Sequence, residues 1–234
     1  AGLKTEVNDL GSGDITTLIS DIGTRLQSDR EANNRQAGTI TYLLLLSRLK
    51  ILQHCLTISG SQQTFTSARW TILQTCSHVL FNDIFAQLFE CLLPILAQYQ
   101  TPLAESVFVA AVQREFQATK QLLEEHGRQG GLPSFNYSDK LLVVHDEAQI
   151  LGDMWDGRFS SMSPGEPDRP LLSPILWGFR KISEINLTLM TSGTGLSIYT
   201  LDRARSAGSF NKSTGSLSDK SEFEKYGISW LYWT

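Results

Sequence analysis

One stretch near the middle of the chain constrains the fold more than any other. Leu141 to Val144 form a short apolar run, and two adjacent carboxylates, Asp146 and Glu147, follow it after a single histidine. A continuous apolar run of this length is typical of a strand that is buried on both faces of a parallel sheet. The carboxyl ends of such strands open into the crevice where α/β proteins bind ligands. The stretch therefore predicts two acidic side chains at the edge of a buried sheet.

The order of apolar strand, aspartate and glutamate is the pattern of a Walker B segment. In such a segment the aspartate, here Asp146, holds a hydrated Mg²⁺, and the glutamate, here Glu147, orients or deprotonates an attacking water. The simpler alternative is a buried strand that ends in a solvated turn, because Asp and Glu are common at strand exits. His145 precedes the two acids and is expected to pack or hydrogen-bond locally rather than to act in catalysis.

A second apolar stretch, residues 185–190, predicts a neighbouring strand that ends in Thr191 and Ser192. A helix is expected between the two strands, over 170–182, so that strand, helix and strand form a right-handed crossover unit. Because adjacent parallel strands end on the same edge, the hydroxyls of Thr191 and Ser192 are expected beside the two acids. There they can serve as a sensor that contacts a γ phosphate or the attacking water. The alternative is that they cap a turn or a helix.

The first half of the chain is expected to be almost entirely helical, because its apolar residues recur at helical spacing. We therefore expect an α/β fold: a partial, P-loop NTPase-like parallel sheet with Walker B and sensor strands, joined to a large all-helical N-terminal half. A helical region over 1–130 and an α/β portion over 131–234 form one incomplete domain in this interpretation. Asp14, Thr66 or Ser67, and Gly127 are candidate helix caps. The helices of the first half are expected at 15–30, 39–58, 67–93 and 103–126.

The net charge and the cysteine content limit the binding partners that we expect and indicate the cellular compartment. The formal net charge of −4 leaves no basic footprint, so binding to nucleic acid is not expected. No apolar run reaches membrane-spanning length, so no membrane association is expected.

The odd number of cysteines and their spacing fit no metal pattern, which favours buried, reduced thiols and an intracellular location, cytoplasmic or nuclear. A secreted-effector origin stays open, although the chain shows no signal peptide. The three cysteines are Cys55, Cys76 and Cys91.

Three further features bear on a nucleotide site. The glycines of Gly11-Ser12-Gly13 are not expected to cradle a phosphate, because a Walker A loop needs a Gly-Lys-Ser/Thr ending whose lysine reaches the phosphates. Residues 151–167 are expected to form a loop that serves as a lid or a partner surface, or else as an ordinary surface segment. Four arginines are candidates for a charge-neutralising finger, with surface ion pairing as the alternative for each. They are Arg169, Arg180, Arg203 and Arg205.

Three stretches together, Leu141–Gln149, Pro174–Arg180 and Leu189–Ile198, resemble the P-loop NTPase module of large fungal families that include Crinkler-type effectors. The resemblance implies that Asp146 binds Mg²⁺, that Glu147 is catalytic and that Thr191 or Ser192 is the sensor. It also implies ATP as the nucleotide and an effector or signalling context. Since no Walker A loop is present, it implies either that this loop lies upstream of Ala1 and the chain is a truncated piece, or that the chain is a degenerate relative. In both cases the chain alone is expected to bind ATP poorly or not at all.

Two other functions fit the same residues. One is a fragment of a nucleic-acid helicase of the class that uses Asp-Glu-Ala-Asp/Gln, although the acidic charge and the helical first half argue against it. The other is a non-enzymatic interaction module, in which the helices bind a protein partner and the NTPase-like remnant serves as a scaffold. Nucleotide-dependent behaviour of the protein separates these possibilities.

Overall fold

The computed structural model of the chain describes residues 13–59, 65–76, 82–98, 102–129, 140–145, 148–161, 168–182 and 186–191. Within these ranges, seven helices and two short strands make up the regular structure. The helices are α1 (Asp14–Arg25), α2 (Arg30–Ser59), α3 (Ser67–Thr75), α5 (Ile84–Gln98), α6 (Pro102–Gln129), α7 (Ala148–Asp153) and α8 (Leu172–Lys181). The strands are β1 (Lys140–His145) and β2 (Asn186–Thr191).

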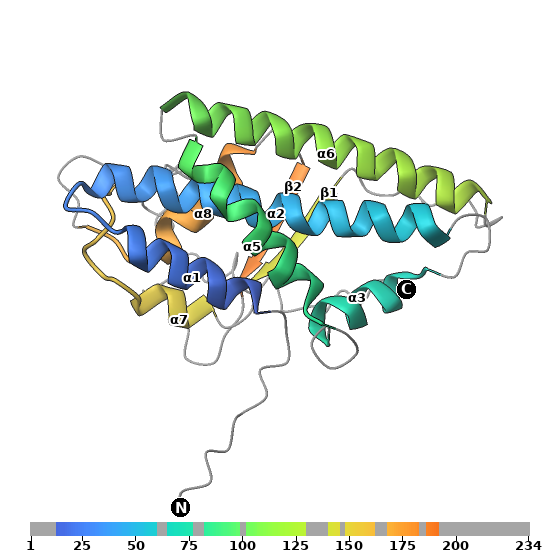
Figure 1. The fold of residues 1–234 in the computed structure, drawn as a ribbon, viewed down its shortest axis with the longest axis horizontal. Coiled ribbons are helices and arrows are strands. Elements are labelled where there is room, and N and C mark those ends of the chain that lie inside the picture. The colour runs from blue at the N-terminus through green and yellow to red at the C-terminus, as the bar shows by residue number, and fades with distance from the viewer. Residues whose placement is uncertain are drawn as a thin grey trace, which may run out of the picture.

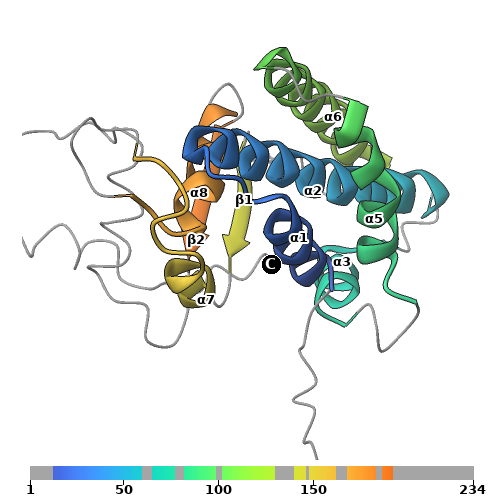
Figure 2. The same ribbon diagram turned by 60° about the vertical axis from the view of Figure 1, so that its left-hand side comes forward.

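Helix α2 is the element around which the others pack. It contains 30 residues, which corresponds to a length of about 45 Å. Figures 1 and 2 show α6 along one side of α2, and α1, α8 and the two strands along the other. The helix is apolar on most faces, as its leucine-rich sequence predicts, and Ala37, Ile40 and Tyr42 are fully buried. The middle of α2, residues 37–45, is buried on all sides, so this helix packs against several neighbours at once. Helices α1, α5, α6 and α8 pack on it, and Arg48 also reaches Gln74 of α3.

One of the three predicted helix caps is confirmed and the other two are wrong. The Thr66 side chain accepts a hydrogen bond from the backbone N–H of Arg69, so its predicted role as the N-cap of α3 is confirmed. The prediction for Asp14 is wrong, because Gly13 occupies the N-cap position of α1 and Asp14 is buried in the first turn. Gly127 lies inside α6 rather than at its C-cap.

The single helix expected over 67–93 is two helices. Helix α3 ends at Thr75, and α5 begins at Ile84 and continues through Pro94. Phe85 and Phe89 of α5 are fully buried, so the prediction that they are packing residues is confirmed. Helix α5 packs against α1 and α2, and the Phe85 ring makes an edge-on contact with Trp70 of α3, with 5.7 Å between the ring centroids.

The two strands lie where the apolar runs predict them, and they pair in parallel. The register places Lys140 opposite Asn186 and His145 opposite Thr191. Helix α8 occupies most of the range expected for the crossover helix and contacts both α2 and β2. The two strands pair with each other and with no further strand of the described residues.

The expected α/β fold class is wrong, because the described part of the chain is helical. Its main core consists mostly of side chains from α1, α2, α5, α6 and α8, whereas Val143 of β1 is only partly buried at its edge. In an α/β domain a multi-stranded sheet forms the middle layer and helices cover it. Here α2 takes the central place, and the strands form one short pair beside it. The division of the chain near residue 130 stays a prediction.

The first three residues of the loop expected over 151–167 belong to a helix instead. Helix α7 continues to Asp153, and a turn follows in which Trp155 and Gly157 have positive φ values of 50° and 78°. Phe159 then forms an antiparallel bridge with Arg169. No described helix combines the length and the apolar character needed to cross a membrane.

Candidate functional site at the carboxyl ends of the strand pair

The register of the two strands brings their carboxyl ends to the same level. His145, the last residue of β1, is opposite Thr191, the last residue of β2. Thr191 is therefore at the end of a parallel strand next to the strand that precedes the acids, as predicted. Asp146, Glu147 and Ser192 lie outside the described residues. The close approach of the two carboxylates to the two hydroxyls stays a prediction.

The chain between β1 and α7 is short, which limits how far the acids can be from the strand pair. Residues 146 and 147 are the two that separate His145 from Ala148, the first residue of α7. Ala148 is fully buried and Leu151 is 2% exposed, so α7 is anchored in the helical core. In sequence, the two acids thus connect β1, which pairs with β2, to α7, which is anchored by the burial of Ala148 and Leu151.

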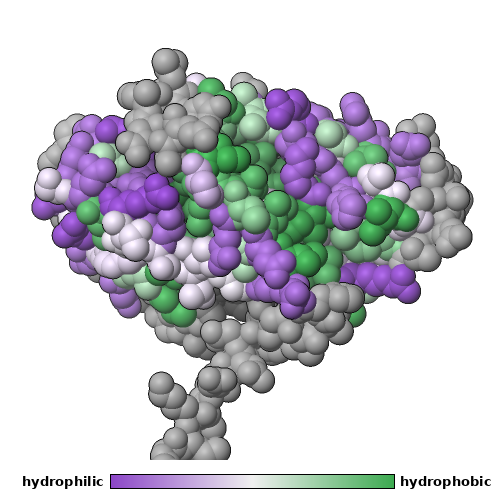
Figure 3. Space-filling model, in the orientation of Figure 1, coloured by the Kyte–Doolittle hydropathy of each residue, from purple (hydrophilic) through white to green (hydrophobic). Residues whose placement is uncertain are grey.

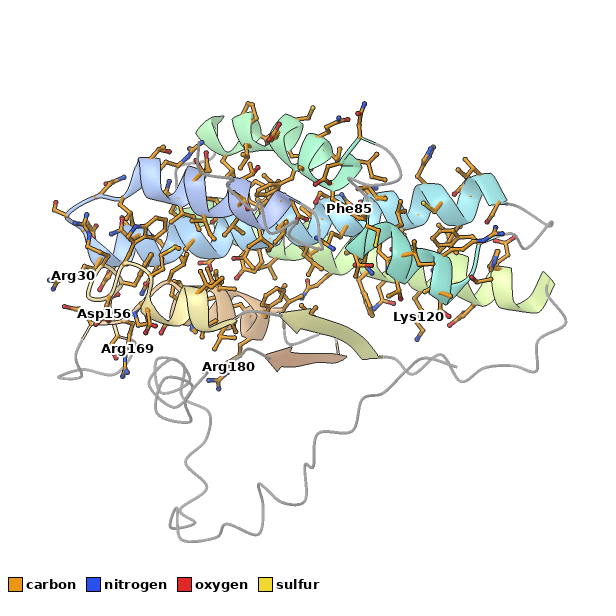
Figure 4. All side chains as sticks on the ribbon, turned by 90° about the horizontal axis from the view of Figure 1, so that it is seen from below. Arg30, Phe85, Lys120, Asp156, Arg169 and Arg180 are labelled. Atoms are coloured by element: carbon orange, nitrogen blue, oxygen red, sulfur yellow. The ribbon has the colours of Figure 1, made fainter. Side chains whose placement is uncertain are left out.

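The candidate arginines differ in their surroundings. Arg169 is 2% exposed, and its backbone N–H donates to the carbonyl oxygen of Phe159 at 2.7 Å. The alternative that Arg169 is a surface residue is therefore wrong. Arg180 is exposed on α8, and Figure 4 shows both arginines on the side of the molecule that carries the strands. Arg203 and Arg205 lie outside the described residues.

Two asparagines at the start of α2 hold the turn that follows α7. The Nδ2 of Asn33 donates to the carbonyl oxygens of Gln27, at 3.1 Å, and of Arg158, at 2.8 Å. The Nδ2 of Asn34 donates to the carbonyl oxygen of Ser160 at 2.9 Å. Backbone carbonyls that are held in this way cannot shift without losing these part-buried hydrogen bonds. Sequence reasoning did not single out this pair, although adjacent asparagines inside a helix are an unfavourable choice that indicates a role for their side chains.

A second polar group missed by sequence reasoning joins α2, α6 and α8. Glu105 accepts a hydrogen bond from the hydroxyl of Tyr42 at 3.3 Å and forms an ion pair with Lys181 at 2.7 Å. Burial, followed by the charge and the hydrogen bond of Glu105, raises the pKa of Tyr42 well above its ordinary value. The phenol therefore stays protonated and acts as a donor. Sequence spacing gives no sign of this group, because its members come from three separate helices.

A third polar group lies farther along the interface between α2 and α6. Glu115 contacts Lys50, Gln53 and Arg114, and it is 7% exposed. The hydrogen bond from Lys50 lowers the pKa of the Glu115 carboxyl, with smaller contributions in the same direction from Gln53 and Arg114, while burial opposes them. Glu115 is therefore held as a carboxylate in a stable, charge-paired arrangement.

The described residues hold no group of three His, Cys, Asp or Glu side chains that could bind a metal ion. The predicted metal ligand, Asp146, is not among them. The three cysteines are free thiols, but the expectation that all are buried is wrong, since Cys91 is exposed and the other two are half-buried. Burial raises the pKa of the Cys55 thiol, which makes this thiol less reactive.

Apolar side chains are exposed on several helices of the described part. Figure 3 shows hydrophobic residues gathered between hydrophilic ones near the centre of one face. Val107 of α6 is 51% exposed, and Ile95 of α5 is 37% exposed. Further exposed residues belong to α2, α3 and α7, so the exposed apolar surface is spread over the molecule rather than confined to one element. These residues are Ile58, Ile72 and Ile150.

Comparisons with known proteins give no match: no family model fits the chain, and no curated protein or solved structure is significantly similar to it.

Proposed function

We propose that the chain carries the metal-binding and water-activating residues of a Mg²⁺-dependent nucleotide hydrolase. The observation that supports the proposal is the parallel register, in which the residue before Asp146 is opposite Thr191. Two parallel strands that end together direct the following residues to one edge, and this edge is where ligands bind beside parallel strands. The proposal does not depend on an α/β core, because it requires one strand pair and the residues that follow it.

Each residue of the proposed site has a distinct task. Asp146 provides the hard carboxylate oxygen that Mg²⁺ prefers, and the ion neutralises charge on the phosphates. Glu147 accepts a proton from the water whose oxygen attacks the terminal phosphorus, while the bond from this phosphorus to the bridging oxygen breaks. The hydroxyl of Thr191 or Ser192 donates to the terminal phosphate or to the attacking water. Such a donor is effective when its backbone is rigid, and the pairing of β2 with β1 supports the backbone of Thr191.

The test measures ATP hydrolysis and nucleotide binding by variants of the full-length protein. Glu147→Gln is expected to abolish ATP hydrolysis while nucleotide binding is retained, because only the proton acceptor is lost. Asp146→Asn is expected to weaken the Mg²⁺ dependence of binding. Glu31→Gln serves as the control, since its carboxylate is on the surface at the start of α2 and 3.8 Å from Arg35. Unchanged turnover in Glu147→Gln would contradict the proposal.

A protein-interaction role is the second candidate, and the exposed apolar residues of α5 and α6 favour it. In this alternative the helices bind a protein partner, and the strand pair contributes stability alone. Thermal unfolding in the presence of Mg-ATP discriminates between the two functions. A midpoint that rises with nucleotide concentration supports hydrolase function, whereas an unchanged midpoint in the full-length protein supports the interaction role. Stimulation of turnover by RNA or DNA would instead favour the helicase class.

A further inference from the structure

The last turn of α8 is tied to the first turn of α6 by a charged contact. The Nζ of Lys181 lies 2.7 Å from the Oε2 of Glu105. The same ammonium group lies 3.4 Å from the centroid of the Trp177 ring, one turn earlier in α8. The side chains of Lys181 and Glu105 are 33% and 15% exposed, so the contact is largely shielded from solvent. Partial burial and the cation–π contact make this ion pair stronger than one on an open surface.

Helix α2 provides the third member of the contact. The hydroxyl of Tyr42 donates to Oε1 of Glu105, so that both carboxylate oxygens have partners from different helices. Tyr42 is fully buried. We call Tyr42, Glu105, Trp177 and Lys181 the Glu105 junction. This junction joins α2, α6 and α8 at one point.

The backbones of α2 and α8 also approach each other closely at this point. A Cβ atom at Gly178 would lie 3.5 Å from the Cα of Gly38 and 3.7 Å from the ring of Tyr42. Close packing against α2 holds one side of α8, and the ion pair of Lys181 with Glu105 holds its carboxyl end. Glu105 is near the amino end of α6 and Lys181 is at the carboxyl end of α8, so each charge is also favourably placed relative to its helix dipole. The carboxyl end of α8 is therefore held from two directions.

We propose that the Glu105 junction positions β2 against β1. Four residues separate Lys181 from Asn186, the first residue of β2, so the end of α8 determines where the strand begins. Ile182, the first of these residues, is fully buried and continues the anchoring. A parallel pair has no tight turn between its strands, so its register must be set by such tertiary contacts. One consequence, which rests on the proposed function, is that the junction also sets the position of Thr191.

Amide hydrogen exchange of the 234-residue chain tests the inference without any nucleotide. Lys181→Met removes the charge but keeps much of the aliphatic length, and it is expected to make the amides of β1 and β2 exchange about fivefold faster, while those of α1 are unchanged. Lys181→Arg keeps both the charge and the ring contact and is expected to restore slow exchange. Lys50→Met is the matched control, because it breaks a different Lys–Glu pair between α2 and α6. Faster strand exchange in both variants, or in neither, would overturn the inference.

The functional consequence is measured separately in the full-length protein. There Lys181→Met is expected to lower kcat for ATP hydrolysis more than it weakens nucleotide binding, because the junction acts through the position of β2. If Lys181→Met alters strand exchange but the parent protein never hydrolyses nucleotide, the junction is supported and the hydrolase proposal fails. If turnover is present and the strand amides do not respond to Lys181→Met, the junction inference fails and the hydrolase proposal stands.

Discussion

Asp14 of α1 is fully buried and forms a two-pronged ion pair with Arg48 of α2. The Nη2 of Arg48 lies 2.9 Å from Oδ1 and 2.6 Å from Oδ2, and its Nε lies 2.9 Å from Oδ2. The Nη1 of Arg48 donates to Gln74 of α3, and the guanidinium lies 4.7 Å from the centroid of the Phe85 ring in α5. One arginine thus connects four helices, and its planar fork suits this task better than a lysine would.

Loss of this arginine is expected to destabilise the fold severely. Arg48→Met should reduce the free energy of unfolding by about 3 kcal/mol, because a buried carboxylate loses its paired charge. Arg35→Met is the control, since the contacts of Arg35 with Glu31 and Asp29 are long and exposed, and it should change stability by less than about 1 kcal/mol. Urea unfolding followed by circular dichroism measures both values. Equal stability of the two variants would show that the buried pair is not important for the fold.

The pair of Lys50 and Glu115 is expected to make stability depend on acid pH. Since the pKa of Glu115 is lowered in the folded state, its contribution is complete above the ordinary value of 4.5 and is lost as the pH falls through the folded value. Lys50→Met should therefore be less stable than the parent chain at neutral pH, and the difference should shrink as the pH falls below 4.5. Urea unfolding across this range gives the two profiles. Lys120→Met, which affects an exposed contact of 4.0 Å with Glu124, should leave the profile unchanged.

The contact between Gly23 and Trp155 is expected to reverse the usual preference for alanine in a helix. A Cβ atom at Gly23 would lie 2.8 Å from Cζ2 of Trp155, which is too close. Gly23→Ala should destabilise the fold by about 1 kcal/mol, because overpacking exceeds the gain in helix propensity. In a Trp155→Leu background the same change should instead be stabilising. A double-mutant cycle measured by chemical unfolding checks the sign, and additive effects would exclude the steric explanation.

The hydrogen bonds of Asn33 are expected to hold the turn after α7. Asn33→Ala removes the part-buried hydrogen bonds to the carbonyls of Gln27 and Arg158 and the one that Asn33 Oδ1 accepts from the Gln27 N–H, and it should cost about 2 kcal/mol of stability. Amide exchange in residues 154–161 should become faster as the turn loosens. Thr57→Ala is the control, because its hydroxyl makes an exposed bond to its own helix. Unchanged exchange in 154–161 would show that the turn is held by other contacts.

Sequence patterns predicted the local elements well. Apolar spacing located α1, α2, α6 and α8, and short apolar runs located both strands and their parallel order. The break between α3 and α5 was missed, because Trp70 and Leu73 have helical spacing although α3 buries none of its residues. Periodicity reports which side chains can share a face, but it does not report whether a partner covers that face.

The candidate site was only partly predictable for the same reason. The acids after β1 and the hydroxyls after β2 are adjacent in sequence to their strands, so the sequence alone suffices to name them. The Glu105 junction is built from residues 63 and 76 positions apart, and no local pattern connects such residues.

Local structure followed from side-chain periodicity, which acts over a few neighbours, and at one helix end, that of Thr66, from capping chemistry. The fold class did not, because it depends on which apolar surface finds the most complementary partner. In this chain the long α2 offers more surface to bury than a pair of six-residue strands, so helices form the core and the strands lie beside it. Only the tertiary structure could settle that competition, since burial is shared among segments that are far apart in the chain.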